Sequence, residues 1–267
     1  MRTWAILLSA GSLLFAQTGQ EGSRPEWPCV AGRSVDSSYI DISESTGGQI
    51  FLFQKGEVGQ ATLFLTADRT HPATVVRAVG MLSDTREFEF PVDSTIRSLL
   101  ILVSIQCRKS ISVFRPSGSE MTAANSTQNV DLQAGRGLKI DDPEPGKWKL
   151  RLQGTGLFVA SVRAQSPIRI SGVEYSDDRK QPLFGLRQQA IARVSGEPET
   201  TQFQLVDAAG DVIAPADTPE AADGKYLFPI TPTIERFRIR MTAVDGAGWP
   251  VQRTHPVLFR AQPQPQP

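Results

Sequence analysis

The chain has 267 residues, which is long enough for two domains of ordinary size behind a short leader. Its 28 basic and 28 acidic residues cancel, so no overall field favours nucleic acid or an anionic membrane as a partner. With only two cysteines, Cys29 and Cys107, it does not belong to the disulfide-dense small scaffolds.

Residues 1–16 have the pattern of a cleavable signal peptide. Arg2 precedes an apolar run from Trp4 to Phe15, and Ala16 supplies a small residue at the expected cleavage position. A membrane-spanning helix needs about 20 apolar residues, and this run is too short to anchor the chain. We therefore expect a secreted, extracellular protein with no membrane span after signal cleavage.

Residues 17–84 differ in pattern from the rest of the chain. The sequence Tyr39–Ile42, the turn Thr46-Gly47-Gly48 and the apolar run Ile50–Phe53 predict the end of a helix, a glycine turn and a short buried strand. A further helix is expected to begin at Lys55 and to connect this segment to the next domain. The segment therefore reads as a short α/β remnant.

Two features of the chain could suggest a metal site. Residues 41–45 spell the Asp-x-Ser-x-Ser pattern of a metal-ion-dependent adhesion site, but polar residues precede it and a glycine turn follows it, so we favour a chance match. His71 and His255 each precede a proline and lack further ligands nearby, which favours exposed turns or strand ends over a zinc site. No Gly-x-Ser-x-Gly elbow is present. We expect no catalytic residue, metal or cofactor.

Residues 85–166 are expected to form a first antiparallel β-sandwich. Trp148 and the two leucines that follow it alternate with cationic residues, so Trp148 is predicted to lie in the core. The run Leu99–Ile105 is almost continuously apolar, as in a central strand covered on both faces. Cys107 continues the inward parity of this run, which suits either a buried unbonded cysteine or a disulfide with Cys29.

Residues 167–261 repeat the pattern with new strands. Thr201–Val206 and Arg236–Met241 both alternate between apolar and polar side chains, and turn residues separate them. The Gln-Pro alternation of residues 262–267 predicts an extended, disordered tail. The expected fold class is all-β, with two consecutive β-sandwich domains preceded by a short α/β remnant and a signal peptide.

Two groups of residues are candidates for contact with a partner. The side chains of Arg236, Arg238 and Arg240 are expected to form an outward stripe, which could bind an acidic partner or a sulfated glycan. Charged residues on an outer strand face also protect an edge or are simply solvated, and we favour that interpretation. Trp249 lies in an expected hairpin loop and is the better candidate for an exposed contact.

Acidic residues cluster at 141–144 and 177–178, in expected loops. Loops of β-sandwiches can bind Ca²⁺ through such groups, although solvated turn residues are commoner. A glycosidase needs two carboxylates on either side of the scissile bond, and nothing else in the sequence supports such a site. A hydrolase is therefore the least favoured function.

Several short motifs occur along the chain in a fixed order: Ser45–Phe51, Phe90–Asp93, Ile101–Ile105, Val113–Gly118, Asp142–Trp148, Gly156–Phe158 and Ile168–Ile170. Their order resembles the region that follows the von Willebrand factor A domain in hemicentins and their relatives. The resemblance implies the end of an A domain with a connecting helix in residues 17–84, a galactose-binding-like sandwich in 85–166 and an immunoglobulin-like domain in 167–261. Only a short stretch precedes the Thr-Gly-Gly turn, so the body of the A domain and its metal-dependent adhesion are not expected here.

The sequence therefore predicts a secreted, non-enzymatic binding or structural protein that mediates extracellular protein interaction or adhesion. Its partner would be an extracellular protein or a glycan, recognised by loops on a rigid frame of strands. The alternative is carbohydrate binding through the loops of the first sandwich, although "galactose-binding-like" names a fold and implies no sugar.

Overall fold

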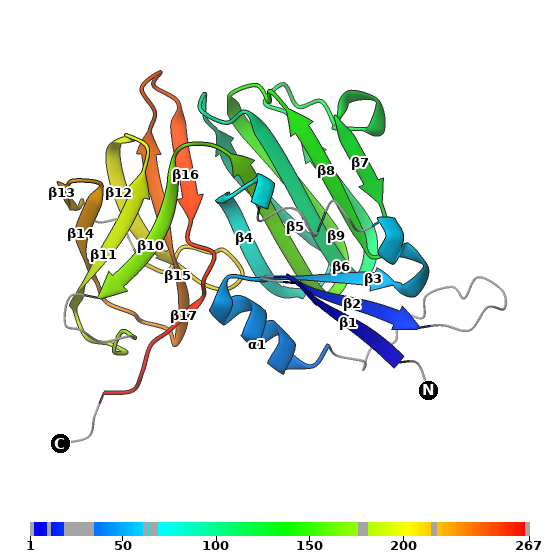
Figure 1. Ribbon diagram of the computed structural model, residues 1–267, viewed down its shortest axis with the longest axis horizontal. Coiled ribbons are helices and arrows are strands. Elements are labelled where there is room, and N and C mark those ends of the chain that lie inside the picture. Colours follow the sequence, from blue (N-terminus) through cyan, green and yellow to red (C-terminus); the bar gives the residue numbers. More distant parts are fainter. Residues whose placement is uncertain are drawn as a thin grey trace.

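The computed structural model describes residues 3–9, 12–18, 35–60, 64, 69–175, 181–214 and 218–264. Two antiparallel β-sandwiches lie side by side, and one α-helix packs across the lower part of their boundary in the view of Figure 1. None of the helices in these described ranges is long and apolar enough to cross a membrane. The predicted all-β class with two sandwiches is confirmed.

The N-terminal part contains the helix, the glycine turn and the strand that the sequence predicts. Helix α1 (Ser37–Thr46) is capped at its N-terminus by Asp36, whose carboxylate accepts a hydrogen bond from the Ser38 backbone amide at 2.9 Å. It ends at Gly47, which adopts the left-handed conformation with φ of 71°. Strand β3 (Gln49–Gln54) follows directly.

The connecting helix expected at Lys55 is a short 3₁₀ helix, η1 (Lys55–Gln60). Its glycines, Gly56 and Gly59, disfavour a regular α-helix. Strands β1 (Thr3–Ser9) and β2 (Ser12–Thr18) form a hairpin, and β2 pairs in parallel with β3. Cleavage after Ala16, which stays a prediction, would remove β1 and most of β2.

Strand β3 is buried on both faces and joins the N-terminal part to the first sandwich. Ile50 and Leu52 pack in one cluster with residues of β4 and β9, while Phe51 and Phe53 pack against Phe64 and leucines of β6. The rings of Phe51 and Phe64 meet edge to face with centroids 4.8 Å apart. The short segment is therefore an integral part of the core.

The first sandwich is built from one strongly bent sheet of six strands in the order β4-β9-β6-β8-β7, with β5 also paired to β9. Its strands are β4 (Ala73–Leu82), β5 (Thr85–Val92), β6 (Ser98–Phe114), β7 (Gln128–Asp131), β8 (Gly135–Asp141) and β9 (Gly146–Gln165). The long strands β6 and β9 bend where their register shifts, between Ile105 and Ser110. At this bend a Cβ atom on Gly154 would lie 2.2 Å from the Cys107 carbonyl oxygen, so only glycine fits.

Two predictions about this sandwich are corrected by the strand pairing. The domain begins at Ala73 and not at residue 85, because β4 pairs with β9 and contributes to the same core. Cys107 is half-buried and not in the core, because the bulge between Ile105 and Cys107 breaks the alternation. Trp148 is a core residue as predicted, with 1% of its surface exposed.

The second sandwich packs a sheet of order β10-β11-β14-β13 against one of order β12-β15-β16, with β17 paired to β15. Its strands are β10 (Arg169–Tyr175), β11 (Gln188–Ser195), β12 (Glu199–Val206), β13 (Glu220–Ala222), β14 (Lys225–Ile230), β15 (Arg236–Val244), β16 (Pro250–Thr254) and β17 (Phe259–Arg260). The core lies between the sheets and includes Phe203, Phe228, Phe237 and Met241.

The tail expected to be disordered from residue 262 is ordered through Gln264. The Gln262 amide donates to the Pro182 carbonyl at 2.8 Å, and the Gln264 side chain donates to the Phe184 carbonyl at 3.1 Å. These bonds align the tail with a loop of the second sandwich, and residues 265–267 lie outside the described residues.

Candidate functional site

A buried cluster of charges joins helix α1 to both sandwiches. Glu44 of α1, 3% exposed, lies between Arg77 of β4 and Arg238 of β15, which are 1% and 0% exposed. Arg77 Nη2 contacts Glu44 Oε1 at 2.5 Å, and Arg238 Nη2 pairs with Glu44 Oε2. One carboxylate thus faces two guanidinium groups, one from each sandwich, and we call this cluster the ionic junction.

Local sequence explains why these side chains meet. On β15, Phe237 and Ile239 point into the core of the second sandwich, so Arg238 between them points to the opposite face. That face is covered by α1, which presents its buried residues Ser43 and Glu44. Burial, with the nearby charge of Arg240, lowers the pKa of Arg238 to about 9.

The prediction that these arginines form an outward stripe is therefore wrong for Arg238 and Arg240. Arg238 is buried, and Arg240 is half-buried and donates to the Gly210 carbonyl at 2.9 Å. Arg236 is the more exposed member, and it pairs with Asp41 at 2.7 Å. The predicted alternation on β15 is confirmed, but its outer face is covered by α1 and by the turn that contains Gly210 and is not open to solvent.

A second set of polar contacts extends the boundary between the sandwiches. Arg253 of β16 pairs with Asp93, which follows β5, at 2.8 Å, and both side chains are at most 1% exposed. Asp245 Oδ2 accepts hydrogen bonds from the amide and hydroxyl of Ser94 at 2.8 and 2.6 Å. The Val79 amide also donates to the Ala208 carbonyl at 2.8 Å, backbone to backbone. An ion pair and three hydrogen bonds therefore join the two sandwiches along this boundary.

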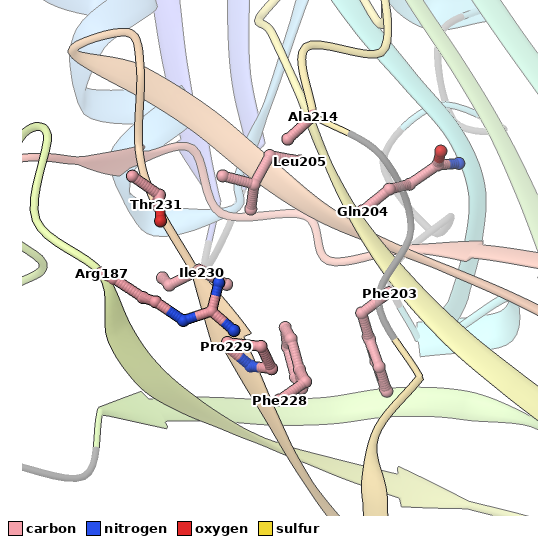
Figure 2. A pocket seen from close by; sticks show the side chains of 9 residues that line it. All are labelled: Arg187, Phe203, Gln204, Leu205, Ala214, Phe228, Pro229, Ile230 and Thr231. Atoms are coloured by element: carbon pink, nitrogen blue, oxygen red, sulfur yellow. The ribbon is translucent and has the colours of Figure 1, made fainter.

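A pocket of about 190 Å³ opens at one edge of the second sandwich, between β12 and β14 (Figure 2). Phe203 and Phe228 stack in its wall, with ring centroids 4.1 Å apart and an interplanar angle of 6°. The remaining lining residues are mostly apolar, with one cation among them: Arg187, Gln204, Leu205, Ala214, Pro229, Ile230 and Thr231. We call this the seam pocket.

The strand order explains why the seam pocket is open. Phe203 and Leu205 of β12 and Phe228 and Ile230 of β14 point between the sheets, as their alternation predicts. Strand β12 is the edge of its sheet, and the opposing edge strand β13 has only three residues. The pocket lies where these two edges face each other, while the inner side chains themselves stay buried, at 1–4% exposure. The pocket depends on strand order, which the alternation of side chains along the sequence does not give.

Arg187 gives the seam pocket its charge. It is exposed and immediately precedes β11, and in Figure 2 its guanidinium extends beside Ile230 and Pro229. Among the residues that the structure describes, no hydrogen bond or ion pair engages the Arg187 side chain. The pocket thus places one exposed cation beside apolar side chains that are themselves mostly buried.

Both histidines lie beside strand ends, His71 just before β4 and His255 directly after β16, but they are buried and not exposed as the sequence predicted. His71 and His255 are 3% and 8% exposed. His71 shares hydrogen bonds with the hydroxyls of Thr70 and Ser98, at 2.7 and 3.0 Å. His255 stacks on Phe259, with centroids 5.2 Å apart. Burial lowers the pKa of each histidine to about 4, so both are neutral at physiological pH.

The residues considered for metal binding have other partners. Asp41 pairs with Arg236, and Ser43 accepts a hydrogen bond from Arg77 at 3.4 Å, so the adhesion-site pattern is part of a helix. Asp141 accepts bonds from Ser98 and Lys139, which lower its pKa, the Ser98 bond most. Across the described ranges, no group of three or more His, Cys, Asp or Glu residues could hold a metal ion. The acidic pair at residues 177–178 lies outside those ranges.

Trp249 is exposed in the turn between β15 and β16, as predicted, with 40% of its surface accessible. Its role in contacting a partner stays a prediction. Cys107 forms no disulfide with a residue that the structure describes, and Cys29 lies outside those residues, so their pairing also stays a prediction.

Several solved structures are distantly similar to this chain. The propeptide form of Bacillus licheniformis lipase BlEst2 has 14% identity and a TM-score of 0.34, over 67% of this chain and 40% of that one. Bacteroides uniformis beta-glucuronidase 3 has 9% identity and a TM-score of 0.27, over 73% and 28% of the respective chains. A chimeric titin Z1Z2-Z1Z2 tandem has 13% identity and a TM-score of 0.21, over 69% and 99%. These scores carry no argument about function.

A search of curated proteins finds no match. One family model matches part of the chain, that of the hemicentin galactose-binding domain-like region, over residues 73–167. This range begins with β4 and ends just after β9, and so coincides with the first sandwich. Residues 73–167 are thus a galactose-binding-like domain of the hemicentin type.

Proposed function

We propose that the chain is a secreted, non-enzymatic binding or structural module that mediates extracellular protein interaction. In this proposal the second sandwich is an immunoglobulin-like domain, and the two domains act as one rigid unit. The observation that carries the proposal is the ionic junction, in which Glu44 bridges Arg77 and Arg238. A spacer or binding module must present its loops at constant positions, and such a junction prevents the domains from moving independently.

The chemistry of the junction supports this role. Burial of charge costs free energy, so a buried ion pair is often no more stabilising than well-packed apolar side chains at the same positions. Charged groups with directional partners, however, reject alternative orientations, because any displacement leaves a buried charge unpaired. We therefore interpret the junction, together with the Asp93–Arg253 pair, as a device that specifies the angle between the domains.

Calorimetry tests the rigid-unit part of this proposal. The two sandwiches should unfold in one transition whose calorimetric and van't Hoff enthalpies agree. Two separate transitions would show that the domains are independent, and would overturn the rigid-unit function.

Sequencing the N-terminus of the protein recovered from a culture supernatant tests export. The mature chain should begin after Ala16. Retention inside the cell, with an intact N-terminus, would contradict secretion.

A glycan array in the presence of Ca²⁺ separates this function from carbohydrate recognition. We expect a flat array. Binding that is lost when loop residues of the first sandwich are changed, and retained when those of the second are changed, would instead support the carbohydrate function.

A further inference from the structure

Strand β3 pairs with a strand that export would remove. Its partner β2 aligns in parallel with it, from Ser12 opposite Gln49 to Gln17 opposite Gln54. In Figure 1 the two strands run side by side below the sheet of the first sandwich, and β1 lies outside them. The expected cleavage after Ala16 removes every β2 residue of this register except Gln17. The mature chain would therefore have a free edge along β3.

The direction of the backbone groups along β3 follows from one hydrogen bond. The Leu52 amide donates to the Ser104 hydroxyl of β6 at 3.1 Å, so this amide is not directed at β2. Successive residues of a strand direct their backbone N–H and C=O groups to opposite edges. The groups of Phe51 and Phe53 therefore point toward β2, and they lose their partners when β2 is removed.

The sequence of β3 lacks the features that protect a sheet edge. Natural edge strands are often short, bulged or charged, which prevents pairing with another chain. Strand β13 has only three residues, and β12 has a shift of register near its start. By contrast, the six residues Gln49–Gln54 contain no charge, proline or glycine, and their register with β2 has no shift. A segment of this composition at a free edge readily pairs with another strand.

The surroundings of β3 specify an apolar occupant. Residues Ile50–Phe53 are at most 3% exposed with β2 in place. Both α1 and η1 lie against β2 as well as β3, so these helices flank a strand in this position. Tyr39 and Ile40 of α1 pack against the apolar cluster that contains Ile50, and a charged side chain beside that cluster would lose its hydration. The segment Leu13–Phe15, which lies opposite Ile50–Leu52, is apolar, as this position requires.

From these observations we propose that the mature chain binds a partner protein by strand addition at β3. The partner contributes an extended, uncharged apolar segment that runs parallel to β3 in the place of β2, over the six residues of the β2–β3 register. Main-chain hydrogen bonds with Phe51 and Phe53 hold the segment, and its side chains lie beside α1 and η1. This inference rests on the proposed export of the chain and names the chemistry of its partner.

Fluorescence polarisation tests the inference on the protein recovered from the culture supernatant. The probe is a fluorescein-labelled peptide with the sequence of β2, Ser-Leu-Leu-Phe-Ala-Gln-Thr, which supplies the strand that cleavage removes. It should bind the mature chain. It should not bind the uncleaved chain, because the tethered β2 competes for the same edge at a millimolar effective concentration.

Two N-methylated probes supply the matched control. In the β2–β3 register Leu14 lies opposite Phe51, so the residues on either side of it, Leu13 and Phe15, direct their backbone groups to β3. Methylation of the amides at these two positions of the peptide removes donors to β3 and should weaken binding by about tenfold or more. Methylation of the amides at the positions of Leu14 and Ala16, which point away from β3, should change binding by less than about twofold.

Amide hydrogen exchange followed by NMR locates the bound peptide. In the mature chain without peptide, the Phe51 and Phe53 amides should exchange about tenfold faster than the Leu52 amide, which is bonded to Ser104. With the peptide, the Phe51 and Phe53 amides should become protected, and the exchange of the Leu52 amide should change little. If the uncleaved chain cannot be prepared, the two methylated probes and the exchange rates still decide the outcome.

The outcomes separate the possible occupants of the edge. Equal binding of the two methylated probes, or no binding of the unmodified probe at millimolar concentration, would overturn the inference. Protection of Phe51 and Phe53 without peptide would also overturn it, with a second copy as the occupant if sedimentation shows a dimer and the chain itself if it shows a monomer. Retention of the uncleaved chain would contradict secretion and this inference together. Failure of the probes on a cleaved, secreted chain overturns this inference alone.

Discussion

Removal of the charge on Glu44 should destabilise the whole chain. Glu44→Gln keeps the shape of the side chain but removes the carboxylate charge that faces the buried guanidinium groups of Arg77 and Arg238. Loss of one partner from a buried ion pair costs about 3–5 kcal/mol, a large part of the roughly 5–15 kcal/mol that stabilises a folded domain. At about 2–4 °C per kcal/mol for a domain of 150–250 residues, the midpoint of thermal unfolding should fall by about 10 °C.

Urea unfolding followed by circular dichroism measures this loss. The midpoint should decrease with little change in slope. Glu235→Gln is the matched control, because Glu235 pairs with Arg260 at 2.6 Å with both side chains more than half exposed. An exposed pair contributes about 0–1 kcal/mol, so this control should be close to wild type.

A combined variant separates charge from packing. The combined variant carries Arg77→Leu, Glu44→Met and Arg238→Met, which removes every buried charge of the junction. This variant should be less destabilised than Glu44→Gln alone. If Glu44→Gln and Glu235→Gln differ by less than about 1 kcal/mol, the junction is not a desolvated charge cluster and the reasoning is refuted.

Three further predictions concern other parts of the molecule. Burial lowers the pKa of His71 and His255 from the ordinary value of 6.5 to about 4. As the pH falls below 6.5, these histidines therefore bind protons in the unfolded chain before they do so in the folded chain. The free energy of unfolding should therefore fall between pH 6.5 and 4, by up to about 3 kcal/mol per histidine, and urea titrations of a variant with both changed to Gln should show a flatter profile. Gly154→Ala should abolish folding or lower the free energy of unfolding by more than about 3 kcal/mol, because the new Cβ would meet a carbonyl oxygen at 2.2 Å. Gly118→Ala is the control, since open space surrounds it, and it should lower the free energy of unfolding by about 1 kcal/mol. Thermal melts compare the two variants. Trp249→Ala should change the free energy of unfolding by less than about 0.5 kcal/mol, and a larger loss would show that its exposed ring packs against the fold.

The seam pocket and the burial of the histidines could not be predicted from the sequence. Alternation on β12 identified Phe203 and Leu205 as inward residues, and the structure agrees. It did not show that β12 is an edge strand, which is what places the pocket beside those residues. His71 could not be placed either, because its partner Ser98 is distant in the sequence and nothing in the local pattern links the two.

The sequence by itself determined the local features of this protein. The alternation around Trp148 is enough to predict a core tryptophan. The run from Ser45 to Phe51 is enough to predict a helix end, a glycine turn and a buried strand. Both succeed because backbone preferences and the two-residue period of a strand act within a few residues. Alternation reveals that Arg238 does not face the core of its own sandwich. Only the tertiary structure decided that the opposite face is covered by α1 and neutralised by Glu44, since contacts between elements far apart in the sequence leave no periodic signal.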